Sequence, residues 1–426
     1  MSASRRFHSR RVPGDKGVFA LMSEAKAAAA AAGKQVVDLS VGTPDLAPPP
    51  EAIEALRASV DDLTTYKYCL RDGTMPLLEA ATEWFASRYG VRLDPATQAL
   101  SLIGSQEGLA HLLMAVADPG EGVLMLPIGY ACYLPAITIA GLRPRFLPLP
   151  DDGSFLPDFD AVPASLAAGC RALLLNYPNN PTSAVADGAF WRRALEFARR
   201  HDLLLINDNP YCCQVYSEDA LAASALAQPG ALERTVELFS MAKSYQLGGC
   251  RLGFALGNAD AIAALEAVKA PVDFNQWLGI QRMGIACLKL PQSRLVEYAQ
   301  IFRARAAALT AALRAHAGWE APMPRACMYL FAPLPPGFSD DARFCLELLG
   351  QTGVALSPGS AFGPAGAGHV RFALVRDEGV LAEAARAIGR FLASPEAARL
   401  RGRGGSEGGA NGGPAADVAA AAGVSG

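Results

Sequence analysis

The chain has 426 residues and a mass of 44.6 kDa, and 51% of its residues are hydrophobic while 19% are charged. This much apolar sequence excludes a disordered chain, and the length predicts one large domain and a smaller one. The 38 basic and 41 acidic residues give a net charge of -3. No field of one sign is therefore available to hold a nucleic acid or an anionic membrane.

Cysteine usage and the N-terminal residues bear on where the protein resides. Nine cysteines without a C-x-x-C unit predict reduced, mostly buried thiols and not a disulfide framework. The first twelve residues are rich in Arg and Ser, but charges break the apolar stretch that follows, so it is no signal-peptide core. The uncharged segment between residues 121 and 143 is interrupted by prolines and glycines, which predicts strand, loop and helix and not a membrane span. We expect a soluble, cytoplasmic protein, with a plastid or mitochondrial location left open.

The middle of the chain repeats one pattern: a short run of branched apolar residues, a turn, and a longer amphipathic stretch. Strands are expected at 99–103, 122–126, 143–147, 172–176, 203–207, 236–239 and 252–256. Most of these runs are nearly continuously hydrophobic, as are strands buried on both faces. The pattern predicts an α/β fold with a mostly parallel seven-stranded sheet covered by helices.

A long amphipathic helix at 291–317 could link this large domain to a smaller α+β domain, for which the runs 329–332, 344–349 and 370–374 are candidate elements. After residue 394 the sequence turns to Gly, Ala and Ser, which cannot offset the entropy of ordering. We place an N-terminal arm at 1–16, an N-terminal segment of the small domain at 17–47, the large domain at 48–294, the linking helix and C-terminal small domain at 295–394, and a disordered tail at 395–426.

The segment SMAKSYQLGGCRLGF, residues 240–254, joins two of the expected strands and carries Lys243. A lysine after a strand is usually a solvated end, but this neighbourhood is apolar, rich in glycine and without a carboxylate. An amine in such surroundings loses its proton readily and becomes a nucleophile that can form a Schiff base. Ser240 and Arg251, in the same segment, are donors that suit a phosphate.

Two further segments end strands in polar residues. LLLINDNPY, residues 203–211, leads into Asp208 and Tyr211. An aspartate at the carboxyl end of a buried parallel strand lies where α/β sheets bind ligands and needs a cationic partner, although an Asx-turn or helix cap is the structural alternative. LLLNYPNNPT, residues 173–182, carries Asn180 on a turn stiffened by two prolines, which by itself is only a turn.

LSLIGSQEGLAHLLMAVAD, residues 100–118, runs from a strand into a helix that Ser105 would cap. Backbone N–H groups at such a helix start suit a phosphate, with a plain capped helix as the alternative. Tyr130 and Tyr133 follow the next strand, and either could stack on a planar ring or pack in the core.

The order of these motifs along residues 19–392 resembles that of the class I and II, fold-type-I, pyridoxal-phosphate-dependent aminotransferases. The turns IGSQEGLAHL, DNPYCCQVY and SMAKSYQLGGCRLGF look most like the branch of LL-diaminopimelate, N-succinyl-diaminopimelate and aspartate aminotransferase-like enzymes. The resemblance implies a fold-type-I transferase that uses pyridoxal 5'-phosphate and no metal. It also implies a homodimer with shared active sites that moves an amino group from an α-amino acid to a 2-oxo acid, with glutamate and 2-oxoglutarate as one pair, in a pathway such as lysine biosynthesis.

The same resemblance implies roles for individual residues. Lys243 would bind the cofactor and act as general base and acid, Asp208 would pair with the protonated pyridine nitrogen, and Tyr211 would hydrogen-bond the ring hydroxyl. Tyr130 would stack on the ring, and Tyr68 would reach the phosphate of the neighbouring subunit. Arg371 and Gly42 would bind the substrate, while Asn180 would contact both the ring hydroxyl and the substrate. The phosphate would be bound by Ser105, Gln106, Ser240 and Arg251. For Arg371 an exposed position on the strand HVRFALV is the alternative.

The chain departs from the family pattern at two places. Ser183 stands where many members read N-P-T-G, a glycine that shapes a turn and carries no chemistry. The segment 270–281 holds no arginine where dicarboxylate-specific aspartate aminotransferases place one, which argues against strict aspartate specificity. A carbon–sulfur β-lyase or an aminocyclopropane carboxylate synthase type enzyme remains the alternative, because Lys243, Asp208 and Arg371 would serve either.

Overall fold

The computed structural model describes residues 9, 11 and 18–403, so most of the arm expected at 1–16 lies outside the described residues. The described chain forms two compact units. The first comprises residues 42–306 and 324–329, and the second comprises residues 18–41, 307–323 and 330–403.

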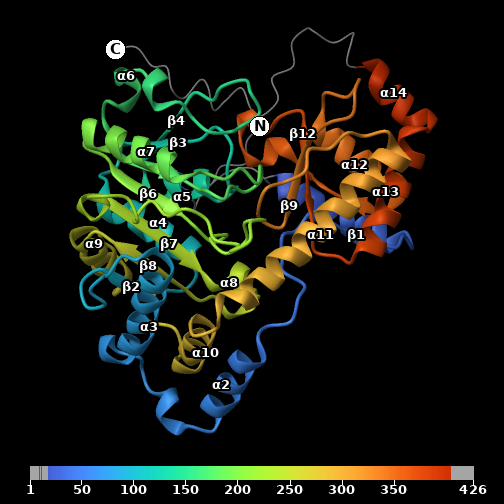
Figure 1. Cartoon of the computed structure of the whole chain (residues 1–426). Coiled ribbons are helices and arrows are strands. Elements are labelled where there is room, and N and C mark those ends of the chain that lie inside the picture. The colour runs from blue at the N-terminus through green and yellow to red at the C-terminus, as the bar shows by residue number, and fades with distance from the viewer. Residues whose placement is uncertain (1–8, 10, 12–17, 404–426) are drawn as a thin grey trace. The chain divides into compact units, whose positions relative to one another are not determined.

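The first unit contains a mixed sheet of seven strands (Figure 1). The strands are β2 (Ala99–Leu102), β3 (Gly122–Met125), β4 (Arg143–Phe146), β5 (Cys170–Leu175), β6 (Leu204–Asp208), β7 (Thr235–Ser240) and β8 (Gly253–Gly257), and their order in space is β2-β8-β7-β6-β5-β3-β4. β8 runs antiparallel to both of its neighbours, while the other paired strands are parallel. The predicted mostly parallel seven-stranded sheet is confirmed.

The continuous apolar runs follow from burial on both faces. On β5, Leu174 points into a core shared with α4 (Ser105–Val116), whereas Leu173 and Leu175 point into a core shared with α7 (Gly188–Arg200). Side chains alternate between the faces of a strand, so a strand covered on both sides needs apolar residues at every position.

Other helices complete the first unit and the crossover to the second. They are α2 (Pro50–Val60), α3 (Arg71–Tyr89), α5 (Tyr133–Ala140), α6 (Ala164–Ala167), α8 (Met241–Ser244), α9 (Ala259–Lys269), α10 (Leu278–Leu288) and the long α11 (Gln292–Ala317), with 3-10 turns at Leu63–Tyr66, Phe159–Ala161, Ala231–Glu233 and Gly248–Cys250. The long helix predicted at 291–317 is thus present, and it passes from one unit to the other at residue 306.

The second unit is an α+β arrangement of small sheets and helices. Its elements are α1 (Val18–Ala31), β1 (Val37–Asp38), β9 (Tyr329–Pro333, whose first residue belongs to the first unit), α12 (Asp341–Thr352), β10 (Val354–Ala355), β11 (Ser357–Pro358), β12 (His369–Ala373), α13 (Glu378–Leu392) and α14 (Pro395–Arg403), with 3-10 turns at Gly359–Phe362 and Pro364–Gly366. β1 pairs with β10 in parallel, and a second sheet has the order β11-β12-β9.

The units divide after residues 41 and 306, whereas the sequence placed the boundaries at 47 and 294. An ion pair accounts for the difference, because both guanidinium nitrogens Nη1 and Nη2 of Arg305 donate to Asp45, at 2.7 and 2.8 Å. This two-point contact ties the loop after residue 41 and the first half of α11 to the larger unit.

The expectation of a disordered tail from residue 395 is wrong at its start, because residues 395–403 form α14. Ala397 is fully buried, its N–H donates to Ser394 Oγ, and the Arg401 guanidinium lies 4.9 Å from the centre of the Phe338 ring. These contacts stabilise one more helix, which composition alone did not indicate. Residues 404–426 lie outside the described part of the chain.

The nine cysteines are free, and seven of them are buried, as their number and spacing predicted. Within residues 18–403, no helix has both the length and the apolar character that a membrane span requires.

Helix α13 passes close to the end of α11 at Gly389, where a Cβ atom would lie 2.0 Å from the backbone oxygen of His316. We expect Gly389→Ala to lower the free energy of unfolding by about 2 kcal/mol, because backbone must shift to admit the methyl group. Gly350→Ala is the matched control, since a Cβ on this α12 glycine has no other atom within 4 Å. The control should be neutral or stabilising by up to about 1 kcal/mol in urea unfolding. Equal losses in both variants would contradict the close packing of α11 and α13.

Candidate active site

Polar residues gather where β5, β6 and β7 end. Leu175 on β5 pairs with Asn207, and Asp208 pairs with Leu238, so the carboxyl ends of these parallel strands reach the same edge of the sheet. The antiparallel β8 begins at this edge, where Gly253 pairs with Ser240 and also with Leu102 of β2. The carboxyl edge of a parallel sheet is the usual place for a ligand in α/β proteins.

Asp208 ends β6 and is 5% exposed. Its Oδ2 accepts a 2.7 Å hydrogen bond from the Tyr133 hydroxyl, while its buried Oδ1 has no hydrogen-bond partner among the described residues. Burial raises the pKa of Asp208 to about 6, and the hydrogen bond from the Tyr133 hydroxyl offsets only part of this effect. A buried carboxylate with an open oxygen can accept a cationic N–H group, which fits a protonated pyridine ring.

A second buried carboxylate, that of Glu237, differs from Asp208 in its hydrogen bonding. Glu237 on β7 accepts hydrogen bonds from Asn207 Nδ2 at 3.0 Å, Ser224 Oγ at 3.0 Å and the Ala225 N–H at 2.6 Å. Burial raises its pKa as well, but its lone pairs are satisfied within the protein. Of these two carboxylates in the described chain, only Asp208 keeps a buried oxygen open for a ligand.

Asn176 connects the N-N-P-T turn to Asp208. Its Nδ2 donates to the backbone oxygen of Asp208 at 2.6 Å, and its Oδ1 accepts from the Asn180 N–H at 2.9 Å. The structure thus brings Asn180, which is 2% exposed, to the end of β6. Asn176 was not among the residues predicted from the sequence, although an amide side chain directly after a buried strand was the available signal.

Tyr329 is another residue of this group that the sequence analysis did not single out. Its hydroxyl lies 3.1 Å from the Tyr211 hydroxyl, and a Cβ on Gly42 would lie only 2.1 Å from it. The backbone oxygen of Tyr329 accepts a 2.9 Å hydrogen bond from Ser183 Oγ. Ser183 has a φ of 58°, the left-handed conformation that glycine adopts most easily, and its hydroxyl bond helps to hold it there.

Lys243 lies on the single turn α8 and is half-buried. Its Nζ donates a 2.5 Å hydrogen bond to the Gly42 backbone oxygen, and no ion pair with a carboxylate is found for it within the described residues. The side-chain amides of Gln214 and Gln246 donate to its own backbone oxygen, at 2.9 and 3.2 Å. The backbone is therefore held in place, while the amine is bound only by a neutral carbonyl and can react.

Three elements meet where an anion would bind. Gly104, with a φ of 85°, precedes Ser105 at the start of α4, and a Cβ on Gly104 would lie 2.6 Å from Arg251 Nη2. The Ser240 hydroxyl caps α8 by accepting from the Ala242 N–H at 3.2 Å. A helix N-terminus, a hydroxyl and a guanidinium side by side suit a phosphate group.

Gln106 and Tyr130 extend this site. The Tyr130 hydroxyl donates to Gln106 Oε1 at 2.9 Å, and the Tyr130 ring stands edge-on to Tyr133 with 5.7 Å between the ring centres. Burial raises the pKa of the Tyr130 hydroxyl, so it stays protonated at neutral pH. Since the Tyr133 hydroxyl bonds Asp208, Tyr130 is the one of these two tyrosines whose ring is free of that bond.

The structure does not bring Tyr68 to this group. Tyr68 is 88% exposed, its ring lies 5.7 Å from that of Phe274, and no hydrogen bond within the described chain joins it to the residues above.

Arg371 lies in the second unit, on β12, and is 4% exposed, so the alternative of an exposed strand arginine is wrong. Its Nη2 donates a 2.6 Å hydrogen bond to the backbone oxygen of Ser40, and its guanidinium carbon lies 4.5 Å from the centre of the Phe362 ring.

A group of possible metal ligands, two of them on the helix that Ser105 begins, already holds a cation. Glu107, His111 and Asp273 lie within 4.8 Å of one another, measured between their ligand atoms. Lys269 Nζ, on a side chain only 3% exposed, is 2.6 Å from Asp273 Oδ1 and 3.4 Å from Glu107 Oε2. Its ammonium supplies the positive charge that a metal ion would bring.

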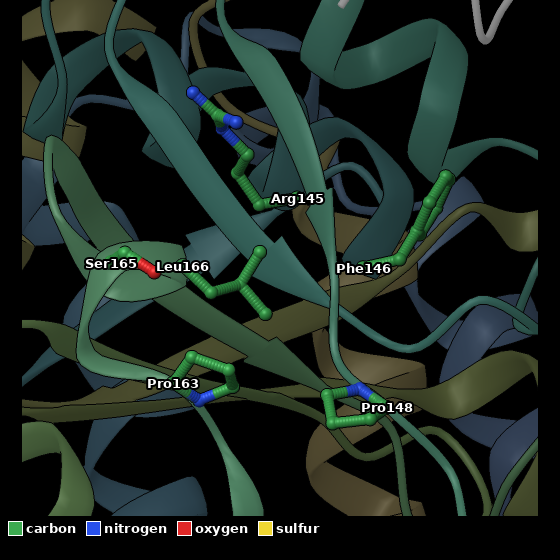
Figure 2. Close-up of a pocket in the computed structure, with 6 residues that line it drawn as sticks. All are labelled: Arg145, Phe146, Pro148, Pro163, Ser165 and Leu166. Carbon is green, nitrogen blue, oxygen red and sulfur yellow. The ribbon is translucent and has the colours of Figure 1, made fainter.

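Figure 2 shows a separate hollow on the first unit, with a volume of about 440 Å³. It is lined by Arg145, Phe146, Pro148, Pro163, Ser165 and Leu166, which come from β4, the loop after it and the region of α6. No residue predicted from the sequence to act on a substrate lines it.

Comparison with known proteins is consistent with this geometry. A model of the family "Aminotransferase class I and II" matches residues 34–388. The LL-diaminopimelate aminotransferase of Syntrophobacter fumaroxidans is 37% identical over 367 residues, covering 86% of this chain and 94% of that protein. Among solved structures, a probable N-succinyldiaminopimelate aminotransferase from Thermus thermophilus is 50% identical, with a TM-score of 0.83 over 88% of this chain and 99% of that one. An aspartate aminotransferase from Thermotoga maritima is 26% identical, with a TM-score of 0.80 over 91% of this chain and 100% of that one.

The buried carboxyl group of Asp208 makes the unfolding free energy of the ligand-free protein depend on pH. A carboxyl whose pKa is raised on folding favours the folded state below its unfolded pKa of 3.8, and this contribution is lost as the pH rises through about 6. We expect Asp208→Asn to match the wild type in unfolding free energy near pH 4 and to exceed it at pH 8 by roughly 3 kcal/mol, since about two pKa units separate the states. Urea unfolding at both pH values measures this.

The control is Asp151→Asn, which removes an exposed carboxylate of the same unit. It should show no such difference between the two pH values. Identical stabilities of wild type and Asp208→Asn at pH 8 would mean that the carboxylate is already compensated in the ligand-free protein.

Proposed function

Because the chain belongs to the class I and II aminotransferases, a family of pyridoxal-phosphate-dependent enzymes, we propose that it transfers an amino group from a diaminopimelate-type amino acid to 2-oxoglutarate. The observation that carries this proposal is the buried Asp208 with one open carboxylate oxygen, on the sheet edge that also bears Lys243. Relatives named for LL-diaminopimelate and N-succinyldiaminopimelate support this substrate class, and lysine biosynthesis is the matching pathway.

Pyridoxal 5'-phosphate, when bound, supplies an electron sink for the charge that develops on the substrate's α-carbon. Asp208 would hold a proton on the pyridine nitrogen through its open Oδ1 and so keep the ring cationic. Lys243 would hold the cofactor through Nζ and carry the proton that leaves the α-carbon. Its neutral Gly42 partner favours this role, because no carboxylate competes for the amine.

The remaining residues would position the cofactor. Tyr211 and Asn180 would donate hydrogen bonds to the ring hydroxyl, and Tyr130 would stack on the ring. Ser105, Gln106, Ser240 and Arg251 would bind the phosphate, with the helix start and the guanidinium giving charge-assisted bonds. The contacts of Arg251 with Gly104 and of Tyr130 with Gln106 support this division of roles.

Arg371 would bind the substrate's α-carboxylate, since a planar guanidinium offers two parallel donors to two oxygens. Gly42 and Asn180 would lie against the same substrate. A glycine is needed at position 42 in any case, because a side chain there would collide with the Tyr329 hydroxyl. The missing arginine at 270–281 favours a donor other than aspartate.

A donor test decides the function. We expect LL-diaminopimelate alone to convert the bound cofactor stoichiometrically to its aminated form, read from the absorbance spectrum, and 2-oxoglutarate to restore it with release of glutamate. Lys243→Ala should retain the fold and lose roughly 10²- to 10⁴-fold in rate, because its proton carrier is gone.

N-Succinyl-LL-diaminopimelate, aspartate, alanine and aromatic amino acids are tested in parallel. Catalytic release of pyruvate and ammonia without the aminated cofactor would identify a β-lyase and refute the transaminase. Conversion by aspartate alone would refute the proposed substrate class while leaving the reaction type intact.

We also propose that the active unit is a homodimer in which Tyr68 reaches the neighbouring subunit's phosphate. Tyr68 belongs to an apolar surface that a monomer would leave in water, formed by the exposed residues Val60, Leu63, Tyr66, Tyr68, Leu70, Val272 and Phe274. Ring contacts join its two segments, between Tyr68 and Phe274 and between Tyr66 and Trp277. Large exposed apolar patches usually mark interfaces, and a second copy is the most economical partner.

Mixing inactive variants tests the shared site. Lys243→Ala and Tyr68→Ala, mixed under subunit exchange, should regain about a quarter of wild-type activity, because half of the dimers are mixed and each has one intact site. Lys243→Ala mixed with Asp208→Ala should regain none, since both residues serve the site of one chain. Full activity of Tyr68→Ala alone, or no recovery despite exchange, would refute the shared site.

A further inference from the structure

A group of polar residues in the second unit converges on one backbone carbonyl, that of Ser40. Arg371 Nη2 donates to this oxygen at 2.6 Å, and Ser357 Oγ donates to it at 2.7 Å. All three residues are buried, with exposures of 4% or less. The Ser40 carbonyl therefore helps to set the direction of the Arg371 guanidinium.

Asp38 restrains the residue that carries this carbonyl, through the Ser40 side chain and through the N–H of the peptide group that precedes it. Its Oδ1 accepts hydrogen bonds from the Ser40 N–H at 2.9 Å and from the Ser40 hydroxyl at 2.6 Å. The first bond closes an Asx-turn, and the second holds the Ser40 side chain to the same oxygen. Ser40 cannot turn without losing two hydrogen bonds to a carboxylate, which are stronger than bonds between neutral groups.

Lys26 from helix α1 holds Asp38 in turn. Its Nζ donates to Asp38 Oδ2 at 2.8 Å and to Ser40 Oγ at 3.2 Å. The two charged side chains are 18% and 28% exposed. Burial raises the pKa of Asp38, but the hydrogen bonds from Lys26 and Ser40 outweigh it and leave the pKa below 3.8. Asp38 is therefore a carboxylate at neutral pH.

The backbone of this segment does not need the ion pair to stay in place. Asp38 pairs with Ala355 between β1 and β10, and the Leu39 backbone oxygen accepts a 2.8 Å hydrogen bond from the Ala373 N–H. Sheet bonds fix the strand, so the specific effect of the side chains falls on the Ser40 carbonyl and its Arg371 partner.

We propose that Asp38 and Lys26 are positioning residues that set the affinity of Arg371 for the substrate's α-carboxylate. Their chain of contacts runs from Lys26 to Asp38, to Ser40, and to the guanidinium. The Phe362 ring, 4.5 Å from the guanidinium carbon, fixes one face of the same group. This inference rests on the proposed role of Arg371 in binding the α-carboxylate.

The experiment compares two acceptors that differ only in that carboxylate. The enzyme in its aminated form reacts with 2-oxoglutarate or with succinic semialdehyde, which lacks the α-carboxylate, and stopped-flow absorbance gives the apparent Kd and the limiting rate for each. In Asp38→Asn and Lys26→Met, we expect the Kd for 2-oxoglutarate to rise about tenfold and that for the semialdehyde to stay unchanged, with limiting rates within about twofold. Lys26→Arg, which keeps the charge, should restore the wild-type Kd.

Glu320→Gln is the matched control, because it breaks an ion pair of the same unit, with Arg314, that does not bond Ser40 or Arg371. Urea unfolding of each variant measures the purely structural effect. Equal weakening toward both acceptors, or an unchanged Kd for 2-oxoglutarate in Asp38→Asn, would overturn the positioning role.

The variant Arg371→Gln distinguishes the positioning role of Asp38 and Lys26 from the proposed role of Arg371 itself. If this variant loses the preference for 2-oxoglutarate over the semialdehyde while Asp38→Asn keeps it, only the positioning role fails. If the wild type has no such preference, or Arg371→Gln retains it, the proposed role of Arg371 fails and the positioning role fails with it.

Discussion

A carboxylate buried at the end of β6 is the constraint around which the larger unit is arranged. Burial without a counter-charge is costly, and it raises the pKa of Asp208 to about 6. Tyr133 satisfies one oxygen and Asn176 holds the backbone of the same residue, but the other oxygen has no partner in the described chain. A ligand that brings a cationic N–H removes this cost, so part of its binding free energy comes from compensating a charge that the fold has already buried.

The groups around this carboxylate are positioned by backbone contacts more than by ion pairs. Lys243 bonds the Gly42 carbonyl, and its own carbonyl is held by Gln214 and Gln246. Tyr329 leaves room only for a glycine at position 42. A site of this kind holds side chains in place without neutralising them, which leaves their charges available for a substrate and cofactor.

In the second unit a backbone carbonyl likewise holds an arginine side chain. Arg371 is buried against the Phe362 ring and donates a hydrogen bond to the Ser40 carbonyl. The Ser40 side chain is bonded in turn to Asp38, which pairs with Lys26. Direct pairing of Arg371 with Asp38 would neutralise both groups. A peptide carbonyl between them passes on the orientation of the ion pair without cancelling the charge of the guanidinium.

Local sequence was sufficient for several features of this protein. Nearly continuous apolar runs identified most of the seven strands of the large sheet, because a strand covered on both faces needs apolar residues at every position, whereas the edge strand β4 reads RPRF. Short motifs also placed Asp208, Lys243 and Arg251 at strand ends, since turn residues directly follow the runs.

Tertiary structure alone decided that Asp208 keeps one oxygen open, that Tyr329 crowds Gly42, that Asp38 reaches Arg371 through Ser40, and that residues 395–403 form a helix. Each of these depends on contacts between residues distant in the chain, or on burial that composition does not reveal. Periodicity reports which face of an element is apolar, but not which side chain of another element lies against it.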